Sequence, residues 1–466
     1  MPFFIFEDMA VPQTASALEK RIKKHVIGKP HRFVAVAPLG FEETLADELK
    51  YIGVECAEEA EIKVTGDGKV EFSAKITEAW KAVAYSRIAN RVLMEIGSFK
   101  AENFGQLEKH AAEIPWELYL DERRKTRDER NAELVLHTTC KHSRLYHSDA
   151  VEERIRNVIL KANESLALGI GCHPERSEAE PRDLAKQHFY ITLIDDRCTI
   201  WQDLAGEELY KRGHERFVAE APLKETIAAA MIFEACQLQP CDSLTTSHQP
   251  LATIIDPMAG SGTFSLEAAY IANGLIPGKC RDFALKHQPA FKEASWNFLV
   301  NRQSFSNLVH RTSSQAPFTI ITSDISERSI SIIRHNVDNS PLKDIYASAG
   351  EKAVAKINPQ LKDFFSLTTQ DIPEGTIILL NPPYGKRLDF DAPKLYTKIG
   401  HKLNEFKNCT VAILAPKDDP RNGAKYTCTT NLLKEYPALD PRNNPKAKLI
   451  ETSHGGISLN ALFAKI

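Results

Sequence analysis

The 466-residue sequence lacks the features that mark membrane, secreted or fibrous proteins. It has no run of about 20 apolar residues, the length that crosses a bilayer, and it has no internal repeat or low-complexity tract. Its first residues include Glu7 and Asp8, where a signal peptide would carry basic residues and an apolar block. We therefore expect a cytoplasmic globular protein, whose length allows roughly two to four domains.

Net charge is almost absent, because 59 lysines and arginines oppose 62 aspartates and glutamates and leave −3. A hydrophobic content of 43% and a charged content of 26% exclude disordered, collagen-like and coiled-coil chains. The balance also argues against a surface that is basic throughout, so any nucleic-acid site has to be a local patch. Residues 20–32 hold six lysines or arginines and two histidines without an acid. Residues 1–30 are therefore predicted to be a flexible basic arm, either solvated or in contact with phosphates.

Cysteine pairs at metal-binding spacing are missing, since none of the nine cysteines forms a C-x-x-C. The closest pair, Cys236 and Cys241, is not followed by a pair of histidines. An odd number at irregular spacing indicates neither a disulfide framework nor a zinc site. We expect no metal, and free thiols in a reducing compartment. The nine are Cys56, Cys140, Cys172, Cys198, Cys236, Cys241, Cys280, Cys409 and Cys428.

What the sequence does have is a change of pattern at about residue 205. Before it, a strand at 33–37 and a helix at 41–52 precede a hairpin around Gly66-Asp67-Gly68. A helix capped by Thr77 is then predicted to run to about Met94, with its apolar residues on one face. This β-α-β-β-α order is typical of a small ferredoxin-like unit.

A second unit follows the first. It has predicted strands at 133–138 and 189–194 and a helix around 150–161, while the segment 172–183, rich in proline, glutamate and arginine, is predicted to be a loop. The two units together form a predicted N-terminal part, residues 31–205.

Residues 206–466 alternate between apolar strands and helices. Alternation of this kind favours an α/β fold with a parallel, doubly wound sheet. The predicted strands are 253–255, 318–322, 376–380 and 411–414, and the predicted helices are 264–272, 329–337 and 395–403.

The segment Asp256-Pro-Met-Ala-Gly-Ser-Gly-Thr263 lies between a strand and a helix, where such a sheet places its ligand crevice. It is not a dinucleotide fingerprint, because Ser265 stands where a third glycine belongs, and it has no G-K-[ST] of a P-loop. A tight turn without a ligand would also use Gly260 and Gly262. An acid at the start of the loop suits a cationic ligand such as S-adenosylmethionine. Asp324, at the end of the next strand, could accept both ribose hydroxyls.

The segment Asn381-Pro-Pro-Tyr384 follows the buried strand 376–380. The Asn381 side-chain oxygen and the Pro382 carbonyl form an acceptor pair for an exocyclic amine, and Tyr384 could stack on the base that bears it. On its own, the pattern fits a Pro-Pro turn with a surface tyrosine better, but its place at a strand end facing Asp256–Thr263 favours the binding role. No cysteine adjoins it, which disfavours carbon methylation through a covalent adduct. The pattern indicates direct methyl transfer to nitrogen without a metal.

Several segments together resemble the RlmL-type ribosomal RNA guanine-N2 methyltransferases. Their segments in this sequence are Gly206-Glu-Glu-Leu-Tyr-Lys-Arg-Gly213, Ala221-Pro-Leu-Lys-Glu-Thr226, Asp256–Thr263, Ile276-Pro-Gly-Lys-Cys-Arg-Asp-Phe-Ala284 and Asn381-Pro-Pro-Tyr-Gly-Lys-Arg-Leu388. In the N-terminal half, the similar segments are 33–45, 86–91 and 143–148.

The resemblance implies a Rossmann-like class I methyltransferase domain preceded by an α+β ferredoxin-like and THUMP RNA-binding domain, with S-adenosylmethionine as cofactor. It implies that Asp363 contacts adenine, for which Asp371 is a weaker candidate. The implied cofactor residues are Asp256, Pro257, Met258, Ala259, Gly260, Ser261, Gly262, Thr263, Asp324, Ile325 and Asp363. The implied catalytic residues are Asn381, Pro382, Pro383 and Tyr384.

The expected partner is structured RNA, foremost 23S ribosomal RNA. A guanine-N2 methyltransferase of transfer RNA and a catalytically silent RNA-binding or ribosome-assembly protein remain alternatives, and the RNA module disfavours a DNA adenine or a glutamine methyltransferase. The candidate RNA-binding residues, each of which could instead belong to a solvated face, are Lys141, His142, Arg144, His147, Lys211, Arg212 and Arg216.

Overall fold

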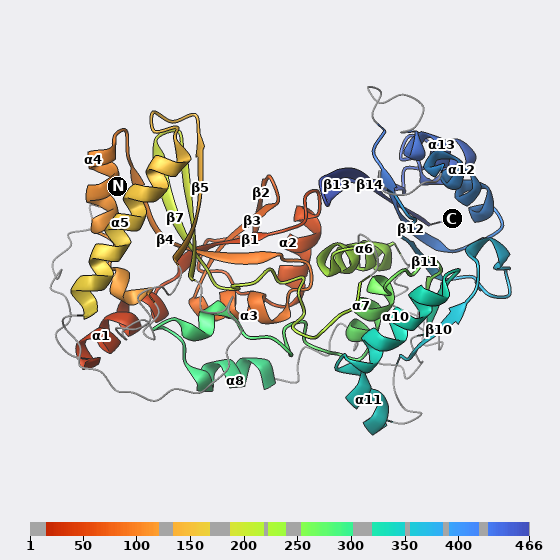
Figure 1. The fold of residues 1–466 in the computed structure, drawn as a ribbon, viewed down its shortest axis with the longest axis horizontal. Coiled ribbons are helices and arrows are strands. Elements are labelled where there is room, and N and C mark those ends of the chain that lie inside the picture. The colour runs from red at the N-terminus through yellow and green to blue at the C-terminus, as the bar shows by residue number, and fades with distance from the viewer. Residues whose placement is uncertain are drawn as a thin grey trace.

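The computed structural model contains two seven-stranded sheets, one in each half of the chain (Figure 1). Figure 1 shows the N-terminal sheet on the left and the C-terminal sheet on the right. The structure describes residues 15–120, 134–167, 187–218, 222–238, 253–301, 319–349, 355–384, 391–418 and 427–465.

The first part of the N-terminal sheet has the predicted ferredoxin-like order, completed by a fourth strand. β1 pairs with both β3 and β4, so that Phe33 lies between Phe72 and Met94, and all three are buried in the core. The elements are β1 (His31–Val36), α2 (Glu42–Tyr51), β2 (Lys63–Gly66), β3 (Lys69–Ala74), α3 (Ile76–Tyr85) and β4 (Arg91–Lys100).

The helix predicted to reach Met94 ends at Tyr85, and this prediction was wrong at its C-terminal end. Ser86 is extended, and the buried carboxylate of Glu48 accepts hydrogen bonds from the Ser86 hydroxyl (2.5 Å) and the Arg87 amide (2.8 Å). These bonds replace the next helical turn, so the chain leaves the helix and enters β4.

The second unit continues the same sheet, because β4 pairs antiparallel with β7. The predicted strands and helix are confirmed, and the predicted loop 172–183 lies outside the described residues. The elements are α4 (Phe104–Ala112), β5 (Leu134–Lys141), α5 (Ser148–Ala167), β6 (Gln187–Ile194) and β7 (Arg197–Asp203), in the sheet order β2-β3-β1-β4-β7-β6-β5.

The basic stretch near the N-terminus is helical, in contrast to the flexible arm predicted. Residues 15–27 form α1 (Ala15–Ile22) and a π-helical turn (Lys23–Ile27). Leu18, Ile22 and Val26 recur every four residues and are buried in the core, while the lysines between them face outward. Burial of this apolar stripe therefore makes the segment helical despite its charge. Residues 1–14 lie outside the described residues.

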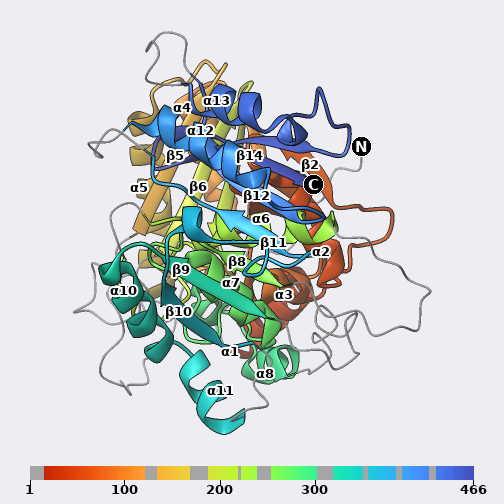
Figure 2. The same ribbon diagram turned by 90° about the vertical axis from the view of Figure 1, so that its right-hand side faces the viewer.

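The C-terminal sheet has the order β10-β9-β8-β11-β12-β14-β13. The strands β10, β9, β8, β11 and β12 are parallel, and β14 runs antiparallel between β12 and β13. Figure 2 shows β10, β9, β8, β11, β12 and β14 of this sheet. The strands are β8 (Ile254–Asp256), β9 (Ile320–Asp324), β10 (Ile357–Leu361), β11 (Ile377–Leu380), β12 (Thr410–Pro416), β13 (Lys448–His454) and β14 (Ile457–Lys465).

This arrangement confirms the predicted Rossmann-like fold. Its helices are α6 (Glu225–Gln237), α7 (Thr263–Ala272), α8 (Glu293–Asn301), α10 (Glu327–Asp338), α11 (Leu342–Ala349), α12 (Ala392–Leu403) and α13 (Cys428–Glu435). Within the described ranges, we find no helix that is both long and apolar enough to cross a membrane.

Parallel pairing brings the carboxyl ends of four strands to one edge of this sheet. Asp256 ends β8 and Asp324 ends β9, while Asp363 and Asn381 follow β10 and β11 within two residues. Ligands of open α/β sheets bind in the crevice at this edge. The predicted cofactor and target segments therefore meet where a doubly wound fold places its site.

Candidate active site

Asp256 is a buried carboxylate that anchors the start of α7. Its Oδ2 accepts hydrogen bonds from the Ser265 amide (3.2 Å) and the Ser265 hydroxyl (2.8 Å), and Thr322 of β9 donates in turn to Ser265 Oγ (2.8 Å). Its Oδ1 has no hydrogen-bond partner among the described residues. One acceptor of this carboxylate is thus left for a ligand.

The environment of Asp256 opposes its ionisation. The pKa of this carboxyl is raised to about 7, chiefly by burial and to a smaller extent by the nearby Asp324 carboxylate, while the two bonds from Ser265 oppose the rise. A cationic group beside Oδ1 would favour the charged form. This agrees with the prediction of a ligand that brings a sulfonium or an amine.

The glycine loop between β8 and α7 needs its glycines for different reasons. Gly260 and Gly262 both have left-handed backbones, with φ of +55° and +80°. A Cβ on Gly262 would lie 3.0 Å from Ile333 Cγ1, whereas a Cβ on Gly260 would meet nothing within 4 Å. Gly260 therefore opens space on the ligand side of the loop, and Gly262 allows the loop to lie against α10.

Asp324 fastens the glycine loop to the end of β9. Its Oδ2 accepts a hydrogen bond from the Gly260 amide (2.8 Å), and its Oδ1 accepts one from the Ser326 amide (2.9 Å). Each carboxylate oxygen retains a second lone pair, which leaves the predicted ribose contact open. The next side chain, Ile325, is 73% exposed and offers an apolar surface beside it.

The two aspartates considered for the adenine end differ in their surroundings. Asp363 caps a short 3₁₀ helix, and its Oδ1 accepts a hydrogen bond from the Phe365 amide (3.1 Å). Asp371 forms an ion pair with Lys362 (2.5 Å) and accepts hydrogen bonds from Thr368, which lower its pKa. Asp363 therefore keeps the freer carboxylate of the two.

The Asn-Pro-Pro-Tyr segment supplies an unpaired acceptor. Asn381 Oδ1 is buried and finds no hydrogen-bond partner in the described part of the chain. Pro382 is buried and Pro383 exposed, and neither has an amide hydrogen to donate. The hydroxyl of Tyr384 lies 3.4 Å from His454 Nδ1, and burial raises its pKa. An unsatisfied buried acceptor of this kind indicates a missing donor.

The predicted RNA-binding residues divide into two groups. Lys141, His142, Arg144 and His147 are exposed around the end of β5, and Arg144 pairs there with Glu102 (2.8 Å). Lys211 is exposed and pairs with Glu207 (3.0 Å). This group is accessible, as a binding patch would require.

Arg212 was wrongly predicted as an RNA contact, because it is only 5% exposed. Its guanidinium bonds to both carboxylate oxygens of Glu267 on α7 (2.9 and 3.2 Å) and to the Arg87 carbonyl of the N-terminal half (2.9 Å). Burial alone would raise the pKa of Glu267, but Arg212 and Arg87 hold it below its ordinary value. Arg212 therefore joins the two halves.

Arg216 was also wrongly assigned to RNA, and it supports the glycine loop instead. It donates hydrogen bonds to Ser261 Oγ (3.1 Å) and Thr263 Oγ1 and forms an ion pair with Glu225, with its side chain 10% exposed. Local sequence does not separate a buried arginine from a solvated one. The available signal was Glu267, a carboxylate in an otherwise apolar predicted helix that needed a cation.

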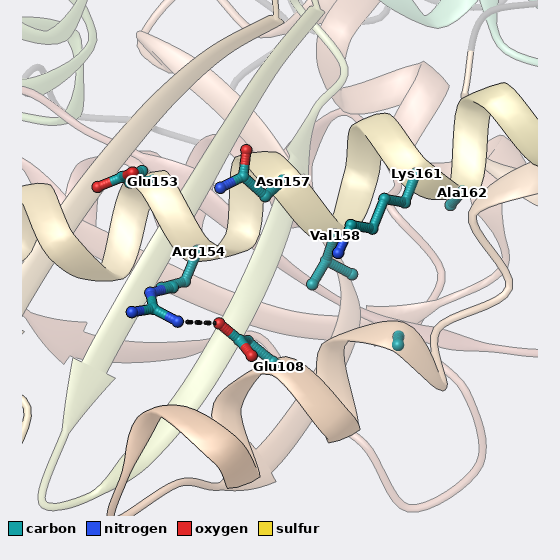
Figure 3. Close-up of a pocket in the computed structure, with 8 residues that line it drawn as sticks. Glu108, Glu153, Arg154, Asn157, Val158, Lys161 and Ala162 are labelled. Atoms are coloured by element: carbon teal, nitrogen blue, oxygen red, sulfur yellow. Dashed lines mark hydrogen bonds and ion pairs between the residues drawn. The ribbon is translucent and has the colours of Figure 1, made fainter.

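A groove of about 590 Å³ lies elsewhere, between α4 and α5 (Figure 3). Figure 3 shows Arg154 pointing toward Glu108, with which it pairs at 2.7 Å. No residue of the two loops lines this groove, so it does not serve the chemistry. Among the described residues, no three histidines, cysteines or acids are placed to hold a metal ion.

Two family models match the chain in order. The RlmL ferredoxin-like domain matches residues 32–93, and an RMKL-like methyltransferase domain matches residues 212–427. The chain thus carries an RlmL ferredoxin-like domain followed by an RMKL-like methyltransferase domain. The methyltransferase domain covers both loops of the site, and its match confirms S-adenosylmethionine as the cofactor predicted from the sequence. The unpaired Asp256 Oδ1 and the open space at Gly260 fit that ligand.

The chain matches nearly the full length of one similar protein and less than half the length of another. It is 27% identical to YpsC of Bacillus subtilis (strain 168), over 84% of this chain and 89% of that protein. It is 28% identical to the ribosomal RNA large subunit methyltransferase K/L of Psychromonas ingrahamii, over 78% of this chain and 43% of that protein. The chain thus spans less than half of the K/L relative.

The same architecture occurs among solved structures. SMU.472, crystallised in complex with SAH, matches 94% of this chain and 98% of its own with a TM-score of 0.64 and 22% identity. At that identity the likeness concerns the fold. It extends over both sheets of this chain.

Proposed function

We propose that this chain is an S-adenosylmethionine-dependent RNA methyltransferase that modifies the exocyclic N2 amine of a guanine in large-subunit (23S) ribosomal RNA. The observation that carries the proposal is Asn381, whose buried Oδ1 has no partner among the described residues and lies at the edge where β8 and β9 also end. An unmade bond to a buried acceptor costs about 1–3 kcal/mol. An exocyclic amine would supply the missing donor.

The residues at the carboxyl-end edge of the C-terminal sheet would have different roles. S-adenosylmethionine, when bound, supplies an electrophilic methyl group. Asn381 Oδ1 and the Pro382 carbonyl would accept hydrogen bonds from the two N–H groups of the amine and turn its lone pair toward that group. As the N–C bond forms and the S–C bond breaks, S-adenosylhomocysteine would leave and one N–H proton of the amine would pass to solvent. Tyr384 would stack on the base and fix its plane. Positioning of this kind provides most of the rate when no group has to be ionised beforehand.

The cofactor would lie along the other segments. Asp256 Oδ1 would face its cationic end, Asp324 would accept from the ribose hydroxyls, and Asp363 would face adenine. The backbone of the glycine loop, from Pro257 through Met258 and Ala259 to Thr263, would line the methionine end.

An RNA substrate is supported by the relatives and by the N-terminal half. The K/L relatives are named for large-subunit ribosomal RNA, and the RlmL ferredoxin-like domain occupies residues 32–93. We propose that residues 31–205 form the RNA-binding part, including a THUMP domain, and residues 206–466 the methyltransferase part. A base inside a duplex would have to be flipped out, which costs a few kcal/mol.

The exposed group at the end of β5, Lys141, His142, Arg144 and His147, is the proposed phosphate-binding patch. Lys141→Ala should weaken RNA binding about threefold and lower the slope of affinity against salt by about one. Filter binding at several salt concentrations measures both quantities. A binding curve and slope equal to those of the unaltered protein would exclude Lys141 from the interface.

The deciding experiment is transfer of a labelled methyl group. The purified protein is incubated with methyl-labelled S-adenosylmethionine and separate fractions of unmodified ribosomal and transfer RNA, and the labelled nucleoside is identified after digestion. We expect N2-methylguanosine from 23S RNA. Label in transfer RNA alone would show that transfer RNA, and not 23S RNA, is the substrate. Label in adenosine or in no nucleoside would overturn the proposal.

A further inference from the structure

His454 lies beside the target loop, residues 381–384, although it is 70 residues from Tyr384 in the sequence. It ends β13, and Gly455 and Gly456, with φ of +58° and +79°, turn the chain back into β14. The hairpin places His454 Nδ1 3.4 Å from the Tyr384 hydroxyl.

The His454 ring also lies near a second segment, the residues just before α6. The backbone of Pro222, three residues before α6, lies near the ring and partly opposes the fall of its pKa. Burial, with the nearby Lys224, lowers the pKa of His454, so the ring is neutral at neutral pH. A neutral imidazole has a single N–H. When that hydrogen is on Nε2, Nδ1 is left to accept a hydrogen bond from the Tyr384 hydroxyl.

We propose that His454 is a positioning residue, which accepts the hydrogen bond of the Tyr384 hydroxyl and thereby fixes the plane of the ring on which the target base stacks. The inference rests on the proposed function in one respect, the stacking role of Tyr384. The contact joins the target loop to the C-terminal hairpin.

The consequence for catalysis follows from the geometry of transfer. A tyrosine side chain rotates about two bonds, and a bond to its hydroxyl restricts both. Without it the base samples more orientations, so fewer encounters align the amine with the methyl group. We therefore expect a loss in kcat, with the Kd for S-adenosylmethionine unchanged.

A double-mutant cycle on the full chain tests this inference. His454→Ala and Tyr384→Phe should each lower kcat about tenfold, and the double variant should be no slower than either, because both remove the same bond. His454→Asn, which keeps an acceptor at the position of Nδ1, should recover part of the rate. Ser453→Ala, at the exposed neighbour on the same strand, is the matched control. Losses that multiply to about a hundredfold, or a His454→Ala enzyme as fast as the unaltered one, would overturn the proposal.

A second readout does not depend on turnover. In ¹⁵N-histidine NMR spectra, the Nδ1 of His454 should be unprotonated and its signal should shift in Tyr384→Phe. A protonated Nδ1, or a signal that ignores Tyr384, would contradict the contact. If the unaltered protein transfers no methyl group to RNA while this signature is present, the proposed function fails and the positioning contact stands.

Discussion

The cofactor loop, residues 256–263, is bonded to its surroundings, whereas the target loop, residues 381–384, keeps its main acceptor unpaired. In the first, Asp324 holds the Gly260 amide and Asp256 holds the start of α7. In the second, Asn381 Oδ1 has no partner among the described residues, and the prolines that follow it have no amide hydrogen. The backbone of the cofactor loop is thus held in place without a ligand, although Asp256 Oδ1 is also left unpaired, and the target loop is completed by its ligand.

The difference gives the two loops separable roles. Changes in the cofactor loop should alter the affinity for S-adenosylmethionine and the stability of the protein. Changes in the target loop should alter turnover and leave both of those quantities in place.

The largest effect is expected in the target loop. Asn381→Ala should lower turnover by about a thousandfold, the upper end of the range for loss of an oriented polar group in an active site. The Kd for S-adenosylmethionine should stay within about twofold, since the residue bonds to no part of the cofactor loop. Single-turnover kinetics and calorimetry measure the two quantities.

Asn339→Ala, at the exposed end of α10, is the control for this variant. Equal losses of turnover and cofactor affinity in Asn381→Ala would refute the separation of the loops.

The next effect is expected at Asp324. Asp324→Ala removes the acceptor of the Gly260 and Ser326 amides and the proposed partner of the ribose, so the Kd for S-adenosylmethionine should rise about 10- to 100-fold. Saturating cofactor should restore most of the turnover. An unchanged Kd in a calorimetric titration would remove Asp324 from the cofactor site.

Asp256 makes the stability of the cofactor-free protein depend on pH. Its pKa of about 7 exceeds the ordinary value of 3.8, so the folded protein holds a proton that the unfolded chain has lost between these two pH values. Stability without cofactor is therefore lost as pH rises from about 4 to 7. Asp256→Asn removes this penalty. Relative to the unaltered protein, the variant should gain on the order of 2 kcal/mol in unfolding free energy between pH 5 and pH 8.

Denaturant unfolding at the two pH values, without cofactor, checks this prediction, with the exposed Asp338→Asn as control. A difference between variant and unaltered protein that is the same at pH 5 and pH 8 would show that Asp256 ionises normally.

The smallest effect is expected at Gly262. An alanine there would hold a left-handed backbone and crowd Ile333, at a cost of about 1–2 kcal/mol. The melting temperature should fall and cofactor affinity should drop severalfold. An alanine at Gly260 would meet open space and would cost only the strain of its left-handed backbone. A larger fall in melting temperature for Gly260→Ala than for Gly262→Ala would therefore contradict the packing described.

The elements of the C-terminal half could be predicted because their signals are local. Asp256 and Asn381 each follow a short apolar strand, and the alternation of strands and helices implies that such strand ends meet. The turn glycines and prolines of both loops are equally visible in the sequence.

The remaining features depend on contacts between distant residues. Arg212 and Arg216 look like surface charges until α7 and the glycine loop bring Glu267 and two hydroxyls to them. The helix ending at Tyr85 is stopped by Glu48, which lies 38 residues from Ser86. His454 has no local signal beyond the glycine pair that follows it.

The measurement that tests the account most directly is a calorimetric titration of the unaltered protein with S-adenosylmethionine. The structure predicts saturable binding at one site, weakened in Asp324→Ala and retained in Asn381→Ala. No measurable binding to the unaltered protein would contradict the account and leave an RNA-binding protein without catalysis.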